Sequence, residues 1–381
     1  MPAFSRRGFL RRTLGATWTG AALLDQSVFR AAAARAQSTG APTQLFDIEK
    51  VAEGVFAAIA RPAALINCNA AIFVRSTDLL VVDTHSKPSA VAALVAQIKK
   101  DITPKPVRYI VNSHFHWDHT QGNPTYKKFA PRADIVASVA TRRLLADNGP
   151  QRLKESVEQT QKSLEEMKAK ATSASGSDKA YYQRMVAEMT AYLKEMQGYA
   201  PELPNITVDR TLVLQDPAHD LHIAFRGRAH TAGDVAVFCP QKRVLATGDA
   251  LHGFLPYIAD AYPAEWPRTL YDWAQFEFQH VIGGHAAVQH SKDRLYHMAA
   301  YLEEITEAVR KAKQAGRSVA QAQQTITPAT LASLNRNGYG DFVAASIARY
   351  YPPGPNPTPA GILSEGVKTN VAHTYTALDR A

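Results

Sequence analysis

Cysteine is scarce in this chain of 381 residues, which contains only Cys68 and Cys239. The two residues are far apart in sequence and belong to no C-x-x-C pair, so we expect neither to be a metal ligand. Both lie near apolar, strand-like segments, and buried free thiols are therefore the default prediction. A disulfide between them stays open, because sequence alone does not establish pairing.

Long hydrophobic runs are lacking too. The apolar region from Leu14 to Leu24 is too short to cross ~30 Å of hydrocarbon, and two glycines interrupt it. It follows the run Ser5-Arg6-Arg7-Gly8-Phe9-Leu10-Arg11 and precedes the small-residue site Ala34-Arg35-Ala36. Residues 1–36 therefore resemble a twin-arginine export signal cleaved after Ala36. We expect a periplasmic or secreted protein that uses the twin-arginine export machinery and keeps no membrane span; an uncleaved anchor is the alternative.

A strong excess of positive charge is lacking once that segment is removed. The whole chain carries a formal net charge of +9, but residues 1–36 hold six arginines and one aspartate, which leaves +4 for residues 37–381. No basic stripe interleaved with aromatic side chains occurs in the chain. We therefore expect no nucleic-acid partner, and a small-molecule substrate instead.

The most informative segment present is His114-Phe115-His116-Trp117-Asp118-His119. It directly follows the apolar run Val107-Arg108-Tyr109-Ile110-Val111-Asn112, which predicts a buried strand. Three imidazoles and a carboxylate at the end of such a strand are costly unless a charge compensates them. Nitrogen and carboxylate ligands suit zinc and iron, and neighbouring side chains point in different directions, so two ions, or one ion with a spare shell, are implied.

Three further segments downstream share this character, because each places an acid or a histidine beside glycine after a short apolar run. They are Gly227-Arg228-Ala229-His230-Thr231-Ala232-Gly233-Asp234, Val244-Leu245-Ala246-Thr247-Gly248-Asp249 and Val281-Ile282-Gly283-Gly284-His285. With Asp83, which ends the strand-like run Leu79-Leu80-Val81-Val82, these make five ordered motifs.

Over roughly residues 44 to 290 the chain resembles the metallo-β-lactamase-fold hydrolase superfamily, specifically its glyoxalase-II-like and lactonase-like branches. The resemblance implies that His114, His116 and His230 hold a first metal, and that Asp118, His119 and His285 hold a second. Asp249 would bridge the two, and Asp83 would support the ligands from outside. Two divalent ions are implied, with zinc expected and iron or a mixed iron–zinc pair as the alternative.

Two positions refine this resemblance. A glycine is common in the family after Asp-Thr, but this chain has His85, which is a supporting donor, a substrate contact or a surface histidine. Many true β-lactamases of the superfamily carry cysteine or serine where this chain has Asp249. An acid there favours hydrolysis of an ester, a thioester or a lactone.

The predicted architecture is α/β, a four-layer αββα sandwich over residues 37–296, and the 46% of hydrophobic residues suffice for one large core. Apolar spacing predicts an inserted helical hairpin at 151–199 that turns at Ser175-Gly176-Ser177, and acts as a lid, as a homodimer interface or only by packing on the sandwich. Residues 297–381 form a helical C-terminal extension, in which the stretch 352–357 leads into an extended tail. Further expected elements are strands at 54–59, 70–74, 79–83, 206–214, 221–225, 235–239 and 244–247, and helices at 89–100, 267–277 and 341–350.

The expected chemistry is attack of a metal-bound hydroxide on an acyl carbonyl of an ester, thioester, lactone or β-lactam, with Asp118 orienting the hydroxide and moving its proton. Arg226 and Arg228 could bind a substrate carboxylate, although a solvated strand edge is the simpler interpretation. Aromatic residues could line an apolar substrate wall or belong to the core; these are Trp117, Phe254, Tyr257, Tyr262 and Trp266.

Two other functions stay open. Relatives with the same motifs are mononuclear iron dioxygenases of persulfides, which would use His114, His230 and Asp249. A non-catalytic binding module is the third alternative, since a fold does not guarantee activity.

Overall fold

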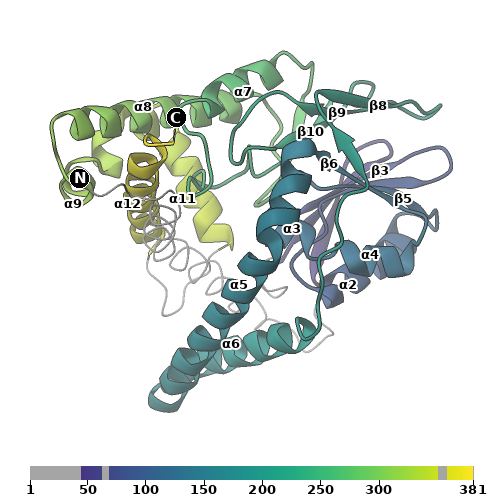
Figure 1. Cartoon of the computed structure of the whole chain (residues 1–381), viewed down its shortest axis with the longest axis horizontal. Helices are drawn as coiled ribbons and strands as arrows, with labels where there is room; N and C mark the ends of the chain where they lie inside the picture. Colours follow the sequence, from purple (N-terminus) through teal and green to yellow (C-terminus); the bar gives the residue numbers. More distant parts are fainter. Residues whose placement is uncertain (1–43, 62–67, 351–357, 381) are drawn as a thin grey trace, which may run out of the picture.

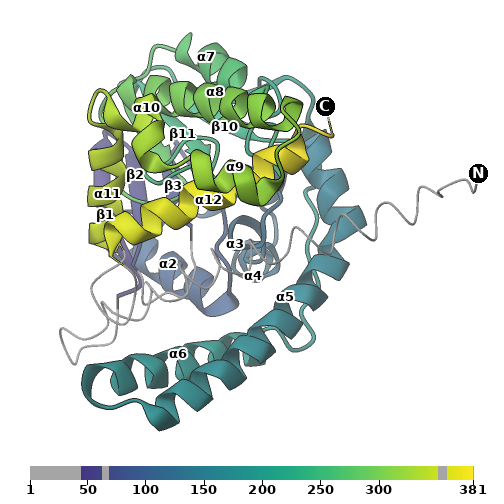
Figure 2. The ribbon, with the colours of Figure 1, turned by 90° about the vertical axis from the view of Figure 1, so that its left-hand side faces the viewer.

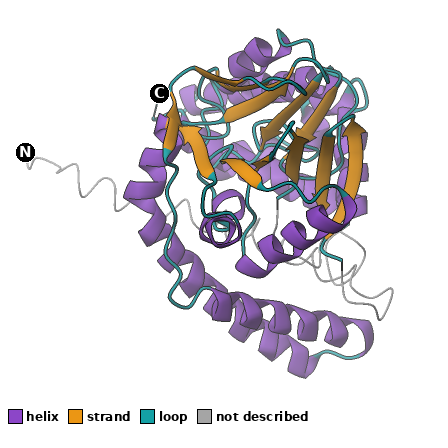
Figure 3. Cartoon of the chain, turned by 90° about the vertical axis from the view of Figure 1, so that its right-hand side faces the viewer, coloured by secondary structure: helices purple, strands orange, loops and turns teal. Residues whose placement is uncertain are grey.

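The computed structural model describes residues 44–61, 68–350 and 358–380, and its strands form two sheets with helices on their outer sides (Figure 1, Figure 3). The expected export signal at 1–36 and the proline-rich stretch 352–357 lie outside the described residues.

The first sheet has seven strands in sequence order. Its first four strands pair antiparallel, and the pairs from β4 to β7 are parallel. Helix α2 (Pro88–Asp101) makes the crossover between β4 and β5, because parallel neighbours need such a connection. The strands are β1 (Phe46–Ala52), β2 (Val55–Ala60), β3 (Ala70–Val74), β4 (Leu79–Val82), β5 (Val107–Val111), β6 (Asp134–Ser138) and β7 (Ile206–Val208).

The second sheet has five strands in the order β12-β11-β10-β9-β8. Only β11 and β12 pair parallel, joined through helix α7 (Trp266–Ala274). The strands are β8 (Thr211–Leu214), β9 (Leu221–Phe225), β10 (Val235–Cys239), β11 (Val244–Gly248) and β12 (His280–Gly283). The strand expected at 206–214 is therefore wrong as one element: Asp209 and Arg210 separate β7 from β8, and the two pieces belong to different sheets.

Three apolar clusters hold the layers together, and they confirm the four-layer αββα sandwich. The central cluster joins the inner faces of both sheets and includes Val82 and Val111 from the first and Val237 and Ile282 from the second. A second cluster packs α2 on the outer face of the first sheet. The third, which includes Leu245 and Val281, packs α7 and α8 (Asp293–Gln314) on the outer face of the second sheet.

A helical hairpin formed by α5 (Val139–Ser173) and α6 (Gly176–Glu195) extends away from the sandwich (Figure 2). Its own apolar cluster includes Met167, Met185 and Tyr192. The base of α6 contacts the sandwich, since Glu195 accepts a hydrogen bond from the Ser89 hydroxyl at 2.7 Å. The hairpin was expected to begin at residue 151, but α5 begins at 139 and continues through Pro150, although a proline ordinarily interrupts or kinks a helix.

The C-terminal extension consists of helices, as expected, but its last segment differs from the prediction. Residues 359–377 form helix α12, not an extended tail, and its residues Val367 and Val371 are buried in the same cluster as α8. Pro359 at its first turn and the Thr358 cap start the helix. The remaining helices of the described residues are short: α3 (Trp117–Thr120), α4 (Asn123–Phe129), α9 (Val319–Thr325), a 3₁₀ turn η3 (Pro328–Thr330), α10 (Ala332–Asn335) and α11 (Tyr339–Tyr350).

Among the described residues, every helix is too short or too polar to cross a bilayer.

Candidate metal centre

The predicted ligands lie in loops after strands β5, β9, β11 and β12. His114 follows β5, and His116 precedes α3, whose first turn carries Asp118 and His119. His230 lies between β9 and β10, while Asp249 and His285 directly follow β11 and β12. The structure brings all seven side chains together, although they come from both sheets.

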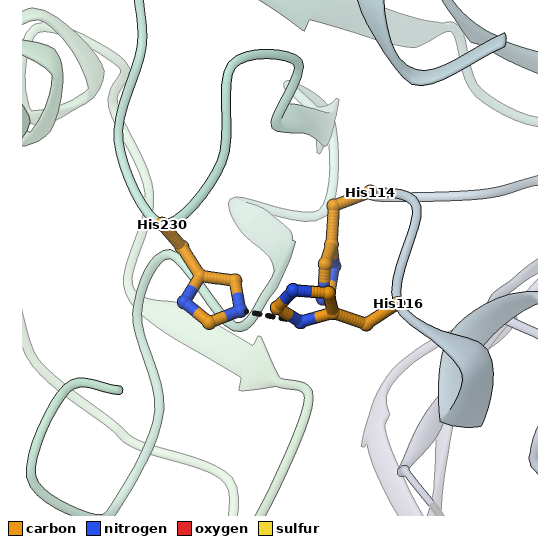
Figure 4. A group of neighbouring side chains, drawn as sticks. All are labelled: His114, His116 and His230. Carbon is orange, nitrogen blue, oxygen red and sulfur yellow. Dashed lines mark hydrogen bonds between the residues drawn. The ribbon is translucent and has the colours of Figure 1, made fainter. Parts of the chain in front are cut away.

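The first group consists of His114, His116 and His230, which are all buried and whose rings surround a common point (Figure 4). The ring centroids lie 4.6 to 4.8 Å apart. Nδ1 of His116 faces Nε2 of His230 at 3.0 Å.

The second group consists of Asp118, His119 and His285, with Asp249 beside it. Nε2 of His285 lies 3.3 Å from a carboxylate oxygen of Asp118 and 3.3 Å from Oδ2 of Asp249. The same Oδ2 lies 3.8 Å from Nε2 of His230 in the first group. Asp249 is therefore placed between the two groups, as the bridging role requires.

Hydrogen bonds on the outer side of the rings fix which nitrogen of each histidine faces inward. His230 donates from Nδ1 to the Tyr257 carbonyl at 3.0 Å, and His116 donates from Nε2 to Asp260 at 2.9 Å. Because both outer partners only accept, the facing nitrogens of His116 and His230 both present lone pairs when the two rings are neutral. A cation between them relieves that contact.

Asp83 fixes two more histidines in the same way. Its Oδ2 accepts from His119 Nδ1 at 2.8 Å and from the Ser113 hydroxyl at 2.8 Å, and that hydroxyl in turn accepts from His114 Nδ1 at 2.9 Å. Asp83 thus lies where the resemblance placed it, behind the ligands. Nε2 of His114 and Nε2 of His119 are left facing inward.

Three of the inward-facing atoms make no hydrogen bond. Nε2 of His114, Nε2 of His119 and Oδ1 of Asp249 are buried without a hydrogen-bond partner, an arrangement that is costly unless an ion is bound. Ligand atoms at ~2.0–2.1 Å from a tetrahedral ion lie about 3.4 Å apart, close to the spacings in the second group. The donor set and its geometry therefore fit divalent metal ions.

In the absence of metal, two histidines of the first group are neutral and two of the second group are charged. Burial lowers the pKa of His114 well below its ordinary value and that of His230 to about 3, so these imidazoles are neutral, as ligation needs. Burial also disfavours the charged form of His285, but Asp249 and Asp118 outweigh it and raise its pKa to about 9. The same kind of balance raises the pKa of His119 and lowers the pKa of Asp249.

His85 and the two cysteines are buried. His85 donates from Nδ1 to the Cys68 carbonyl at 3.0 Å, so the surface alternative for this histidine is wrong. Both cysteines are free thiols, which excludes the disulfide left open from sequence. Cys68 Sγ lies near Asp83 and His119, a proximity that the sequence did not predict. Burial raises the pKa of this thiol to about 12, and this disfavours the thiolate form that binds a metal.

The candidate substrate residues separate into three kinds. Tyr257 lies near the first group, with ring centroids 6.2 Å from His116 and 6.1 Å from His230. Trp266 is buried in the core behind the second sheet, with its ring centroid 5.6 Å from that of His230, and Trp117 packs against the hairpin. Both candidate arginines already have partners: Arg228 pairs with Glu265 and Arg226 lies over the Phe276 ring.

Sequence reasoning missed Asp260 and Arg152. Asp260 lies between two alanines with no neighbouring glycine, and Arg152 lies in the hairpin, so neither shows the local pattern that identified the other residues.

A protein family and several solved structures are similar to this chain. The family model of the metallo-beta-lactamase superfamily matches residues 64–280, more than half of the chain. Similar solved structures include a metallo-beta-lactamase from Pontibacter korlensis, with 18% identity, a TM-score of 0.49 and coverage of 68% of this chain and 99% of that chain. The DIM-1 metallo-beta-lactamase has 19% identity and a TM-score of 0.48, with coverage of 68% and 97%. On the family match, this chain belongs to the metallo-beta-lactamase superfamily.

Proposed function

We propose that this protein is a binuclear metal-dependent hydrolase of the glyoxalase-II-like and lactonase-like kind, acting on an acyl substrate. One observation carries the proposal. His114, His116, His119 and His230 each use one ring nitrogen for an outer hydrogen bond and turn the other toward a shared interior that Asp249 adjoins.

The chain's residues divide the work between them. His114, His116 and His230 would hold the first ion, Asp118, His119 and His285 the second, and Asp249 both. Bound divalent ions would act as Lewis acids toward a carbonyl oxygen and lower the pKa of water from ~16 toward ~7.

Asp118 is the proposed catalytic residue. Its carboxylate lies 3.3 Å from His285 Nε2 and 3.4 Å from His119 Nε2, and its side chain keeps 11% of its surface exposed. Asp118 would accept a proton from the attacking water and return it to the leaving oxygen, sulfur or nitrogen. The bond from that atom to the acyl carbon breaks as the new carbon–oxygen bond forms.

The carboxylate of Asp249 favours an ester, thioester or lactone over a β-lactam, because true β-lactamases of the superfamily often carry cysteine or serine there.

The test combines metal analysis with a substrate screen. We expect close to two zinc ions per mature chain, and hydrolysis of at least one of an aryl ester, a lactone, a thioester or nitrocefin. Asp249→Ala should lose turnover and bound metal, while its circular dichroism spectrum stays unchanged. Asp272→Ala, at an exposed position of α7, should keep its turnover and its bound metal. A metal-replete Asp249→Ala protein with normal kinetics would contradict the bridging role; one iron per chain with oxygen uptake would indicate the dioxygenase.

We also propose export by the twin-arginine route, on the strength of Arg6 and Arg7 and the small-residue site at Ala36. Replacing both arginines by lysine should leave the protein inside the cell with residues 1–36 attached. Cell fractionation and the mass of the recovered protein check this. A homodimer through the hairpin stays a prediction.

A further inference from the structure

A single short segment supplies the outer hydrogen bonds of two histidines in the first group. The Tyr257 carbonyl accepts from His230 Nδ1 at 3.0 Å, and the Asp260 carboxylate accepts from His116 Nε2 at 2.9 Å. We call residues 257–260 the orienting segment. Its position sets the ring orientation and the tautomer of both histidines, and with them the lone pairs available to a metal.

The hairpin contacts this segment through one side chain. Arg152 in α5 donates from one guanidinium nitrogen to both oxygens of Asp260, at 2.7 and 2.8 Å. The same guanidinium lies 4.6 Å from the ring centroid of Phe115, the neighbour of His116 in sequence. Arg152 therefore contacts both Asp260, which accepts the hydrogen bond of His116, and Phe115, which precedes His116 in the chain.

The C-terminal extension contacts the same segment. Arg380, three residues beyond the end of α12, donates to the Ala259 carbonyl at 2.8 Å. His373 in α12 is buried, and its ring centroid lies 5.7 Å from that of Tyr257. Each residue of the orienting segment except Ile258 thus contacts the hairpin, the C-terminal extension or a histidine of the first group. Ile258 itself is buried in the core.

We infer that Arg152 and Arg380 are positioning residues, through which the hairpin and the C-terminal extension hold residues 257–260 and so set the affinity of the first metal position. This inference rests on the proposed metal-dependent function. Removing either arginine should loosen Asp260 or Ala259, let the rings of His116 and His230 turn, and weaken metal binding there.

The simpler explanation is that Arg152 and Asp260 only tie the hairpin to the sandwich. The two side chains are 36% and 27% exposed, and ion pairs in such settings contribute little to the stability of a fold. That explanation predicts a lower thermal midpoint for the metal-free variant, with unchanged metal affinity. Metal affinity therefore distinguishes the two explanations.

The experiment titrates metal-free full-length protein with zinc against a chelator, and with cobalt by visible absorption. We expect Arg152→Gln and Asp260→Asn to lower the affinity for one of the two ions by about 10–100-fold, as loss of a ligand's outer hydrogen-bond partner does elsewhere. The cobalt spectrum should change as well. Arg152→Lys should restore part of the affinity. Arg143→Gln, the same substitution at an exposed position of α5, should match the wild type.

Two wild-type affinities and a wild-type spectrum in Arg152→Gln would overturn the inference and leave the proposed function standing. Absence of metal binding by the wild type would overturn the proposed function itself. Arg380→Gln provides an independent arm should Arg152→Gln fail to fold, because Arg380 is exposed beyond the last helix. It should weaken the same ion, and unchanged affinity in this variant would contradict the part assigned to the extension.

Discussion

At the scale of single residues, glycines next to the ligands leave the space that the metal centre occupies. A Cβ on Gly284 would lie 2.0 Å from Oδ1 of Asp249 and 2.9 Å from Cε1 of His119. At Gly248 the φ angle is +54°, and a Cβ would lie 2.1 Å from the Ser113 hydroxyl oxygen. The glycines beside the acid and histidine motifs are thus a steric requirement of the site.

We predict that Gly284→Ala displaces the Asp249 carboxylate and costs at least one bound metal. Metal content by plasma mass spectrometry and the rate of acyl hydrolysis measure the effect, and both should fall. Gly149→Ala is the matched control, since a Cβ there meets nothing within 4 Å, and it should keep its metals. Full metal content in Gly284→Ala would mean that the loop shifts without disturbing Asp249.

At the scale of elements, one carboxylate in the C-terminal extension links two helices by hydrogen bonds. Glu304 in α8 accepts the backbone N–H groups of Ala332 and Ser333, each at 2.7 Å, at the start of α10. Burial alone would raise the pKa of Glu304, but hydrogen bonds from Ser333 and Ala332 outweigh it and hold the pKa below its ordinary value of 4.5. The carboxylate acts as a helix cap supplied by another helix.

We predict that Glu304→Gln lowers the free energy of unfolding by about 1 kcal/mol at pH 7, because an amide offers only one oxygen to the two donors. The folded-state pKa is depressed, so this stabilisation is present above the unfolded pKa and is lost as pH falls through the folded one. Urea unfolding should therefore show the difference from wild type at pH 7 and a smaller one near pH 3.

Glu365→Gln, at an exposed position of α12, is the control and should change the free energy of unfolding by less than about 0.5 kcal/mol at either pH. A Glu304→Gln difference that grows on acidification would contradict the sign worked out above.

At the scale of the whole molecule, the candidate metal centre takes its residues from both sheets. His114 and His116 follow β5 of the first sheet, whereas Asp249 and His285 follow β11 and β12 of the second. Ions held by both sets would resist separation of the sheets. Without ions, the molecule keeps buried ligand atoms that make no hydrogen bond.

We predict that removing metal with a chelator lowers the thermal midpoint by several degrees. A ligand at 100 times its Kd stabilises the folded state by about 2.7 kcal/mol, and about 1 kcal/mol shifts the midpoint of a protein above 150 residues by about 2–4 °C. Scanning calorimetry with and without added zinc measures this, and the zinc-induced shift should be smaller in Asp249→Ala. Equal midpoints with and without metal would contradict metal binding to the folded state.

The sequence alone predicted those features that leave a pattern in neighbouring residues. Apolar runs identified most strands and α2, because strand burial and helix periodicity are properties of neighbouring residues. The seven ligand-type residues were recognised because their motifs follow short apolar runs and resemble those of a known family, although the residues come from both sheets. Elements without such a pattern were missed or misread, among them α5 through Pro150 and the helical tail α12.

Only the tertiary structure decided which distant residues serve the site. Asp260, Arg152 and Arg380 lie in three different parts of the chain, and nothing in their surrounding sequence marks them. Their contacts depend on how the hairpin and the C-terminal helices pack on the sandwich, and packing is set by side chains far apart in sequence. The sequence by itself therefore predicted the fold class and the candidate ligands, while packing decided which remote groups hydrogen-bond to those histidines, because such contacts join segments far apart in sequence.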